Sequence, residues 1–301
     1  MAPSSIKVCL RVRPASLSRS IHRVAYALGR HAPPWAVVVP RASDADVVIH
    51  HLVGLTGWAE QLAADRAAGK RYVLIQYCLR STEDPRPETW LPIWQSAALV
   101  WSYYDLPAFA GTDDFPHFLS PLGVDTETFR PPVGWPAAAP AEYLIGTSGF
   151  VAETEGVLEA YRAVERIPGG KQFHLGPIPS PGPQMVTAHG ITDATLAVQW
   201  GACRFVAGLR RCEGFELPAL EGLACGARAV CFDAPHYREW YGEHAEYVPE
   251  TDAATVTDVL ADLFARPPRP VTPAERAHIA ATFDWQHIAG AFWDALRDSL
   301  G

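Results

Sequence analysis

Residues 213–226 run Glu213-Gly214-Phe215-Glu216-Leu217-Pro218-Ala219-Leu220-Glu221-Gly222-Leu223-Ala224-Cys225-Gly226. Proline at a first helical position fixes φ without losing a needed hydrogen bond, so Pro218 predicts a helix start. The apolar residues 203–207 predict a strand before it, and Arg210 and Arg211 follow that strand. Free N–H groups and a helix dipole pointing into such a turn form an anion site. With two glutamates eight residues apart beside it, the segment suits a ligand carrying both phosphate and hydroxyl groups, such as a sugar nucleotide.

This segment resembles the Glu-x7-Glu region of retaining glycosyltransferases of the GT-B fold, specifically the large family four (glycosyl transferases group 1). In that family the segment lies in the C-terminal, donor-binding domain. The resemblance implies that Glu213 faces the transferred sugar as a catalytic residue and that Glu221 holds the ribose hydroxyls. It also puts Phe215, Glu216 and Leu217 in the donor site. The alternative is a capped helix with two surface carboxylates.

Composition bounds the class of protein. The chain has 301 residues, enough for two domains of ordinary size, and its 49% hydrophobic and 19% charged residues predict a globular protein. A net charge of −8 gives no overall basic field for a polyanionic partner. The six cysteines form no Cys-x2-Cys pair, which favours reduced thiols and a cytoplasmic location. No signal-peptide core and no run of about 18 apolar residues is present, so we expect a soluble protein without a transmembrane segment.

Alternating strand and helix patterns predict parallel α/β sheets, which bind ligands at the carboxyl ends of their strands. In the first 120 residues the expected strands are 6–12, 35–39, 45–50, 72–77 and 97–101, with helices over 18–28 and 58–68. In the second half we expect strands at 143–149, 173–176, 229–232 and 247–249, and residues 189–193 predict a short strand and the cap of another helix. Two apolar stripes predict helices: Val157, Leu158, Tyr161 and Val164 on the first, and Val256, Val259, Leu260 and Leu263 on the second, which Asp252 caps.

Two further segments set the domain boundaries. Residues 123–131 resemble the family's crossing between domains, and the Pro/Ala/Gly-rich run 132–140 predicts a linker. Phe283-Asp284-Trp285 resembles the Phe-Ser-Trp that opens the family's last helix, on which Ile288, Phe292 and Leu296 continue an apolar stripe. The resemblance therefore implies a GT-B fold of two Rossmann-like domains with parallel sheets facing across a cleft. Residues 1–124 form the acceptor domain, 125–283 the donor domain, and 284–301 a crossover helix that returns to the first domain.

The chain departs from the family where the donor diphosphate is gripped. Phe150 and Glu155 stand where typical members carry an Arg and a Lys. We expect Arg210 and Arg211 to replace them, since a guanidinium matches phosphate geometry, together with backbone N–H groups of the turn ending at Gly149. The alternative for the two arginines is a solvated pair at a strand end. Which group replaces the missing cations stays open.

The first domain also departs from the family pattern. The strand where many members carry a histidine near the reacting sugar offers Tyr77 instead, but His50-His51 ends an earlier strand. A histidine at a strand's carboxyl end can orient a hydroxyl or carry a proton, so we assign His51 a catalytic role. The alternative is a histidine satisfied by a neighbouring backbone group. Further on, residues 236–238 replace a Gly-rich loop with bulky side chains.

The leading hypothesis is a retaining hexosyl- or pentosyltransferase that moves a sugar from a nucleotide-diphosphate donor to a hydroxyl acceptor, with no metal and no cofactor beyond the donor substrate. The departing diphosphate would assist attack on the same face, so stabilising its charge is the main catalytic task. One alternative is the same chemistry on a macromolecule such as a hydroxylated base in DNA, bound by the early arginines, among them Arg11 and Arg13. Another, motivated by Phe150 and Glu155, is a sugar-nucleotide-binding protein that has lost turnover.

Overall fold

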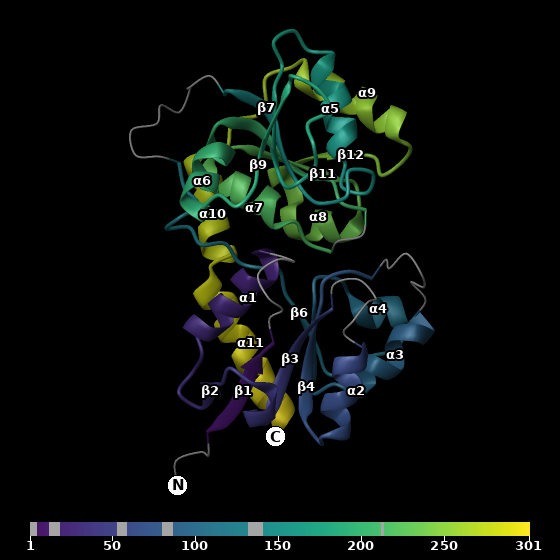
Figure 1. Cartoon of the computed structure of the whole chain (residues 1–301), viewed down its shortest axis with the longest axis vertical. Coiled ribbons are helices and arrows are strands. Elements are labelled where there is room, and N and C mark those ends of the chain that lie inside the picture. The colour runs from purple at the N-terminus through teal and green to yellow at the C-terminus, as the bar shows by residue number, and fades with distance from the viewer. Residues whose placement is uncertain (1–4, 12–18, 53–58, 80–86, 132–140, 212–213) are drawn as a thin grey trace. The chain divides into compact units, whose positions relative to one another are not determined.

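In the computed structural model, the chain divides into two compact units that each contain a six-stranded parallel sheet (Figure 1). The structure describes residues 5–11, 19–52, 59–79, 87–131, 141–211 and 214–301. The first unit comprises residues 1–123, 212–215 and 285–301, and the second comprises 124–211 and 216–284. The expected linker, 132–140, lies outside the described residues.

The sheet of the first unit has the strand order β2-β1-β3-β4-β5-β6. Its chain order is β1 (Ile6–Leu10), α1 (Arg19–Arg30), β2 (Ala36–Val38), η1 (Ala42–Asp44), β3 (Val47–Leu52), α2 (Ala59–Ala67), β4 (Arg71–Gln76), α3 (Pro87–Gln95), β5 (Leu99–Ser102), α4 (Leu106–Ala110) and β6 (His117–Leu119). Every pairing is parallel, as the alternation of strands and helices predicts. The order reverses between β1 and β3, so the carboxyl ends of these two strands flank the topological switch point.

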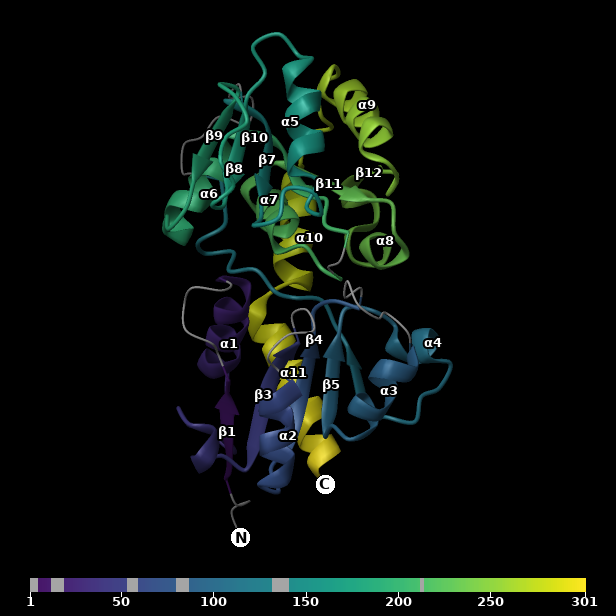
Figure 2. The ribbon, with the colours of Figure 1, turned by 45° about the vertical axis from the view of Figure 1, so that its right-hand side comes forward.

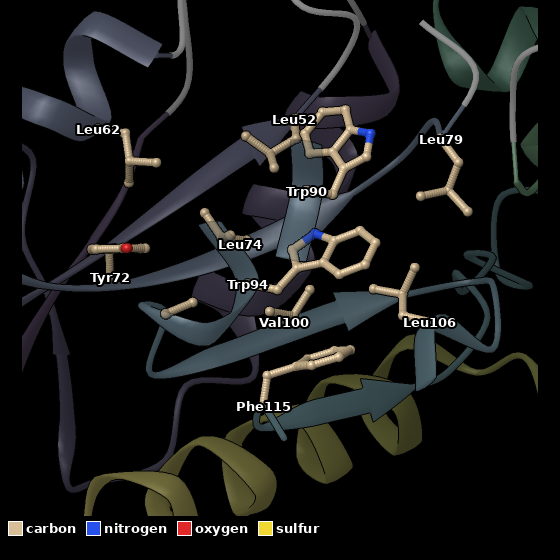
Figure 3. Close-up of a cluster of buried hydrophobic side chains, with 11 residues drawn as sticks. Leu52, Leu62, Tyr72, Leu74, Leu79, Trp90, Trp94, Val100, Leu106 and Phe115 are labelled. Atoms are coloured by element: carbon tan, nitrogen blue, oxygen red, sulfur yellow. The ribbon is translucent and has the colours of Figure 1, made fainter. Parts of the chain in front are cut away.

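An aromatic cluster covers one part of this sheet. Trp90 and Trp94, both on α3, stack with ring centroids 6.2 Å apart, and Figure 3 shows them among the apolar side chains of β3, β4 and β5. Trp94 donates through Nε1 to Gln76 Oε1 (3.1 Å), and the amide of this fully buried glutamine donates to the Cys78 carbonyl (2.6 Å). A polar group buried in this way must find its partners inside the protein. The cluster therefore fixes both α3 and the end of β4.

The last helix, α11 (Trp285–Leu300), completes the first unit although it follows the second unit in sequence. Its stripe of Trp285, Ile288, Phe292 and Leu296 is buried, as the helical spacing predicts. In the view of Figure 2 this helix runs behind the sheet. Trp293 donates to the carbonyl of Leu28 at 3.1 Å, which ties the helix to α1. The expected return of the C-terminal helix to the first domain is confirmed.

The second unit has the strand order β12-β11-β10-β7-β8-β9, again entirely parallel. Its elements are β7 (Tyr143–Ser148), α5 (Val157–Glu165), β8 (Gln172–Leu175), β9 (Met185–Ala188), α6 (Asp193–Gly201), β10 (Cys203–Gly208), α7 (Leu217–Cys225), β11 (Arg228–Phe232), α8 (Pro235–Tyr241), η2 (Gly242–His244), β12 (Ala245–Val248), α9 (Ala253–Phe264) and α10 (Pro273–Thr282). The reversal falls between β7 and β10. Both six-stranded sheets match the expected Rossmann-like α/β class.

Local chemistry explains where the helices begin. Asp252 caps α9 by accepting from the N–H groups of Ala254 and Thr255, as expected. The strand expected over 189–193 is wrong, because β9 ends at Ala188 and Gly190 then adopts a φ of 68° that breaks the extended backbone. The helix cap expected in the same residues is confirmed, because Thr192 caps α6 and its hydroxyl accepts from the N–H of Thr195.

A buried arginine fastens α10 to the second sheet. Arg228, on β11, is 1% exposed and pairs with Glu275 (2.9 Å). Its guanidinium also donates to the carbonyls of Arg269, His244 and Pro270, so its charge is well compensated. Glu275 in turn accepts from the N–H of Thr272 and completes a capping box at the start of α10.

Candidate functional site

The candidate donor site lies at the topological switch point of the second sheet. β7 and β10 pair in parallel, so the turn after Ser148 and the residues after Gly208 emerge at the same edge. Open parallel sheets bind ligands at such a point. The segment that resembles the donor-binding motif leaves β10 there and enters α7.

The turn after β7 presents backbone N–H groups to an anion, and that anion is the protein's own. The Oε2 atom of Glu155 accepts from the N–H groups of Phe150 (2.5 Å) and Val151 (2.7 Å). Gly149, at φ 153°, makes the approach possible, because a Cβ atom there would lie 1.9 Å from this same oxygen. Glu155 therefore points back into the turn.

Arg210 reaches the same turn from the end of β10. Its Nη2 atom donates to Ser148 through the hydroxyl (3.1 Å) and the carbonyl (3.3 Å). Its guanidinium also lies 3.4 Å from Glu155 Oε1 and 3.6 Å from Glu216 Oε2. The structure thus brings together Arg210, Gly149 and Glu216 from the expected set and adds Ser148 and Glu155.

Arg211 is placed differently. Its Nη2 atom pairs with Glu159 Oε1 on α5 at 2.8 Å, and its guanidinium lies over the Phe232 ring at 4.9 Å. Its backbone N–H and side chain also donate to the carbonyls of Thr154 and Glu153. These contacts hold the loop before α5 to the rest of the second unit. The geometry supports a structural role for Arg211 and leaves Arg210 as the better-placed cation for a phosphate.

The start of α7 is buried. Glu216 is 1% exposed and precedes Leu217, the first helical residue. Tyr237 donates through its hydroxyl to the carbonyl of Arg210 (3.1 Å) and to Glu216 (3.4 Å), and Tyr241 donates to the Glu216 carbonyl. The bulky residues 236–238 thus belong to a helix, α8, which contacts Arg210 through Tyr237.

Glu221 lies inside α7 and is 2% exposed. Its Oε2 atom accepts from Trp200 Nε1 at 3.0 Å, a contact that the sequence did not indicate. The following residue, Gly222, lets α7 pack closely on β10, since a Cβ there would lie 2.5 Å from Val206. The helix thereby holds the carboxyl of Glu221 in one place, and its role at a ribose stays a prediction.

The structure describes only part of the rest of the motif. Glu213 lies outside the described residues, and its role at the transferred sugar stays a prediction. Gly214 and Phe215 belong to the first compact unit: the N–H of Gly214 donates to the Tyr77 carbonyl (3.0 Å), and Phe215 packs against Tyr103.

In the first unit, the histidine pair stands at the switch point between β1 and β3. His51 Nδ1 lies 3.0 Å from the Tyr77 hydroxyl, and its Nε2 is enclosed without a hydrogen-bond partner among the described residues. Burial, reinforced by the nearby His50, lowers the pKa of His51 to about 3. The ring is therefore neutral near pH 7 and can accept a hydrogen bond.

His50 points to the other face. Its Nε2 atom lies 2.9 Å from Asp65 Oδ2, and Arg11 pairs with the same carboxylate at 2.9 Å. Burial and then the charge of Arg11 lower the pKa of His50 to about 4, against the opposing effect of Asp65. This triad ties β1 and β3 to α2. Arg11, one of the arginines considered for a DNA surface, is engaged in it, and Arg13 lies outside the described residues.

Among the described residues, no cluster of three or more His, Cys, Asp or Glu side chains is arranged to hold a metal ion. The described helices include none with the length and apolar character needed to cross a bilayer.

Comparisons with known proteins support the fold. No protein-family model matches the sequence, and no curated protein is significantly similar to it. The structure of Anabaena HepE in complex with UDP and glucose is similar with a TM-score of 0.70, at 11% identity over 97% of this chain and 100% of HepE. AviGT4, a glycosyltransferase involved in Avilamycin A biosynthesis, gives a TM-score of 0.64 at 16% identity over 98% of each chain.

A third similar structure is the sucrose-phosphate synthase from Thermosynechococcus elongatus, with a TM-score of 0.65 at 17% identity over 89% of this chain and 82% of that one. Identities this low establish a shared fold. The chain therefore has the fold of these proteins, and the expected GT-B fold is confirmed. Membership in family four stays a prediction.

Proposed function

We propose that this protein is a glycosyltransferase that moves a hexose or pentose from a nucleoside-diphosphate donor to a hydroxyl acceptor, with retention of configuration. The observation that carries the proposal is the position of the donor-like segment. It follows β10 at the switch point of the second sheet, enters α7, and has Arg210 beside it. Sequence resemblance and the ligand-binding rule for parallel sheets thus converge on one place.

The chemical task at this place is to stabilise a departing diphosphate. Once the Glu155 carboxylate is displaced, Arg210 and the N–H groups of Phe150 and Val151 supply positive charge and hydrogen-bond donors at the edge of the sheet. Groups fixed by the fold stabilise a developing charge without reorganising during the reaction. We therefore assign the leaving-group role to these protein groups and propose no metal.

The remaining roles follow the resemblance. Glu221 holds the ribose hydroxyls and Glu213 positions the transferred sugar. In the first unit, His51 accepts the proton of the acceptor hydroxyl or orients that hydroxyl. A pKa of about 3 keeps the ring neutral at physiological pH, so it can accept a hydrogen bond and orient the hydroxyl, but it is a weak base for removing the proton.

One observation favours a second function, a sugar-nucleotide-binding protein with little or no turnover. The Glu155 carboxylate accepts hydrogen bonds from the N–H groups of Phe150 and Val151 in the turn after β7, where a transferase needs to bind phosphate. Binding through the ribose and base does not depend on that turn, whereas stabilising the leaving group does.

The two functions are separated by one pair of assays. A panel of nucleoside-diphosphate sugars is screened by thermal shift, and the best ligand is then tested for release of nucleoside diphosphate with a set of hydroxyl acceptors. A shift that depends on Glu221 together with turnover supports the transferase, and a shift without turnover supports the binding protein. If no member of the panel shifts the unfolding temperature, both proposals fail.

A further inference from the structure

The turn between β7 and α5 carries an anion of the protein's own in the place where the proposed donor needs one. Glu155 bonds two successive backbone N–H groups, those of Phe150 and Val151, through a single oxygen at 2.5 and 2.7 Å. Successive N–H groups of a turn form a concave site for anions, and phosphate oxygens bind such sites in the same way as a carboxylate oxygen does. The carboxylate of Glu155 thus has the position of a phosphate oxygen.

The second carboxyl oxygen extends the likeness. Oε1 of Glu155 lies 3.4 Å from Arg210 Nε, so one carboxylate spans the turn and the cation. Arg210 is shared with Glu216, which is almost fully buried and lies 3.6 Å from Nη1. One guanidinium facing two carboxylates has no net positive charge to offer. A diphosphate must therefore displace Glu155 before Arg210 and the turn can bind it.

The turn lies at the protein surface. The side chains of Phe150 and Val151 are 61% and 49% exposed, although their N–H groups are engaged by Glu155. Because residue 149 is a glycine, no side chain there keeps the Glu155 carboxylate away from the turn. In the structure, the side chain of Glu155 engages both of these N–H groups.

We propose that Glu155 is an internal competitor of the donor phosphates. Its carboxylate occupies the phosphate site formed by the Phe150 and Val151 amides and Arg210, and it sets the donor affinity and selects against ligands that do not displace it. The inference rests on the proposed function and adds to it the residue that controls access to the donor site.

Isothermal titration with inorganic pyrophosphate tests this inference without assuming the nucleotide. Glu155→Gln keeps the size of the side chain and removes its charge, and Glu155→Ala removes the competitor altogether. Glu153→Gln is the matched control, because Glu153 is an exposed carboxylate in the same loop with the same charge. Circular dichroism melts of each variant show whether the turn still folds.

We expect Glu155→Gln and Glu155→Ala to bind pyrophosphate at least about tenfold more tightly than the wild type, since a charge-assisted bond no longer has to be replaced. Glu153→Gln is expected to bind as the wild type does. Adding Arg210→Met to Glu155→Gln should abolish the gain. An unchanged or weaker affinity in both Glu155 variants overturns the inference, and so does an equal gain in Glu153→Gln, which would indicate a general effect of charge.

The outcome separates this inference from the proposed function. A nucleoside-diphosphate sugar that binds through Glu221 but is indifferent to Glu155→Gln contradicts the internal competitor and leaves the transferase standing. Tighter pyrophosphate binding in Glu155→Gln, with no nucleoside-diphosphate sugar bound by any variant, establishes the anion site and refutes the proposed function.

Discussion

Glu221→Gln separates a ligand-binding carboxylate from a structural one. The side chain is 2% exposed, and its Oε2 accepts from Trp200 Nε1 over 3.0 Å. The amide oxygen of glutamine can still accept this hydrogen bond, so the unliganded variant should unfold within about 1 kcal/mol of the wild type. Glu221→Ala removes the acceptor and leaves the buried indole N–H without it, which costs about 1–3 kcal/mol.

Donor binding should respond to the lost charge. Hydrogen bonds to a charged group contribute about 1.5–3 kcal/mol, so Kd should rise about 10- to 150-fold in Glu221→Gln. At 100 times its Kd, the donor stabilises the wild type by about 2.7 kcal/mol. At the same donor concentration, the stabilisation of the variant falls to between about 0.3 and 1.4 kcal/mol.

Denaturant unfolding with and without the best nucleoside-diphosphate sugar measures both quantities. Glu165→Gln, an exposed carboxylate at the end of α5, is the control for a simple loss of charge. If Glu221→Gln keeps the full ligand-induced stabilisation, the carboxylate does not hold the ribose. Glu221 would then serve only to anchor Trp200.

Three further predictions concern Arg210, Glu275 and His51. Arg210→Met should weaken nucleoside-diphosphate binding about tenfold or more by calorimetry, whereas Arg211→Met should chiefly lower stability; equal effects on binding would contradict the distinction drawn from their partners. Glu275→Gln removes the carboxylate that pairs with the buried Arg228 and should cost about 3–5 kcal/mol near pH 7 in urea unfolding. Burial raises the pKa of Glu275, but hydrogen bonds from Arg228 and the Thr272 N–H outweigh this effect and hold the pKa below its usual range. The ion pair therefore stabilises the fold above the unfolded pKa of 4.5, and the stability difference between variant and wild type should shrink only as the pH falls below that value. A stability difference that disappears at pH 6 would refute this. His51→Gln should lower kcat about 100-fold, and the wild-type rate should show no titration of this ring near pH 6.5, because its pKa of about 3 keeps it neutral from pH 5 to 8; a limb at 6.5 that is lost in the variant would contradict the burial argument.

The spacing of apolar residues and the chemistry of helix caps made most of the fold predictable. The buried strands of both sheets and the stripe on α11 follow from apolar spacing, and Asp252 marks its helix start by a local hydrogen bond. Four of the described helices were missed: α3, α4, α8 and α10. α3 contains Pro92 inside it, and α8 and α10 are short or weakly apolar, so their positions depend on tertiary contacts such as the bond of Tyr237 to Arg210.

The site was less predictable because its contacts join distant segments. Arg210 and Arg211 are neighbours in sequence, yet one reaches Ser148 and the other reaches Glu159. Sequence distance carries no information on such a division. For Glu155, the acidic residue in place of an expected cation was a signal, but only the geometry places its carboxylate on the amides of the turn.

We expect a sugar nucleotide to bind at the carboxyl ends of β7 and β10. Hydrogen–deuterium exchange with and without the nucleoside-diphosphate sugar that gives the largest thermal shift tests it most directly. We expect protection of backbone amides in residues 149–156 and 214–221. Protection confined to other parts of the chain, with these two segments unchanged at saturation, would contradict it.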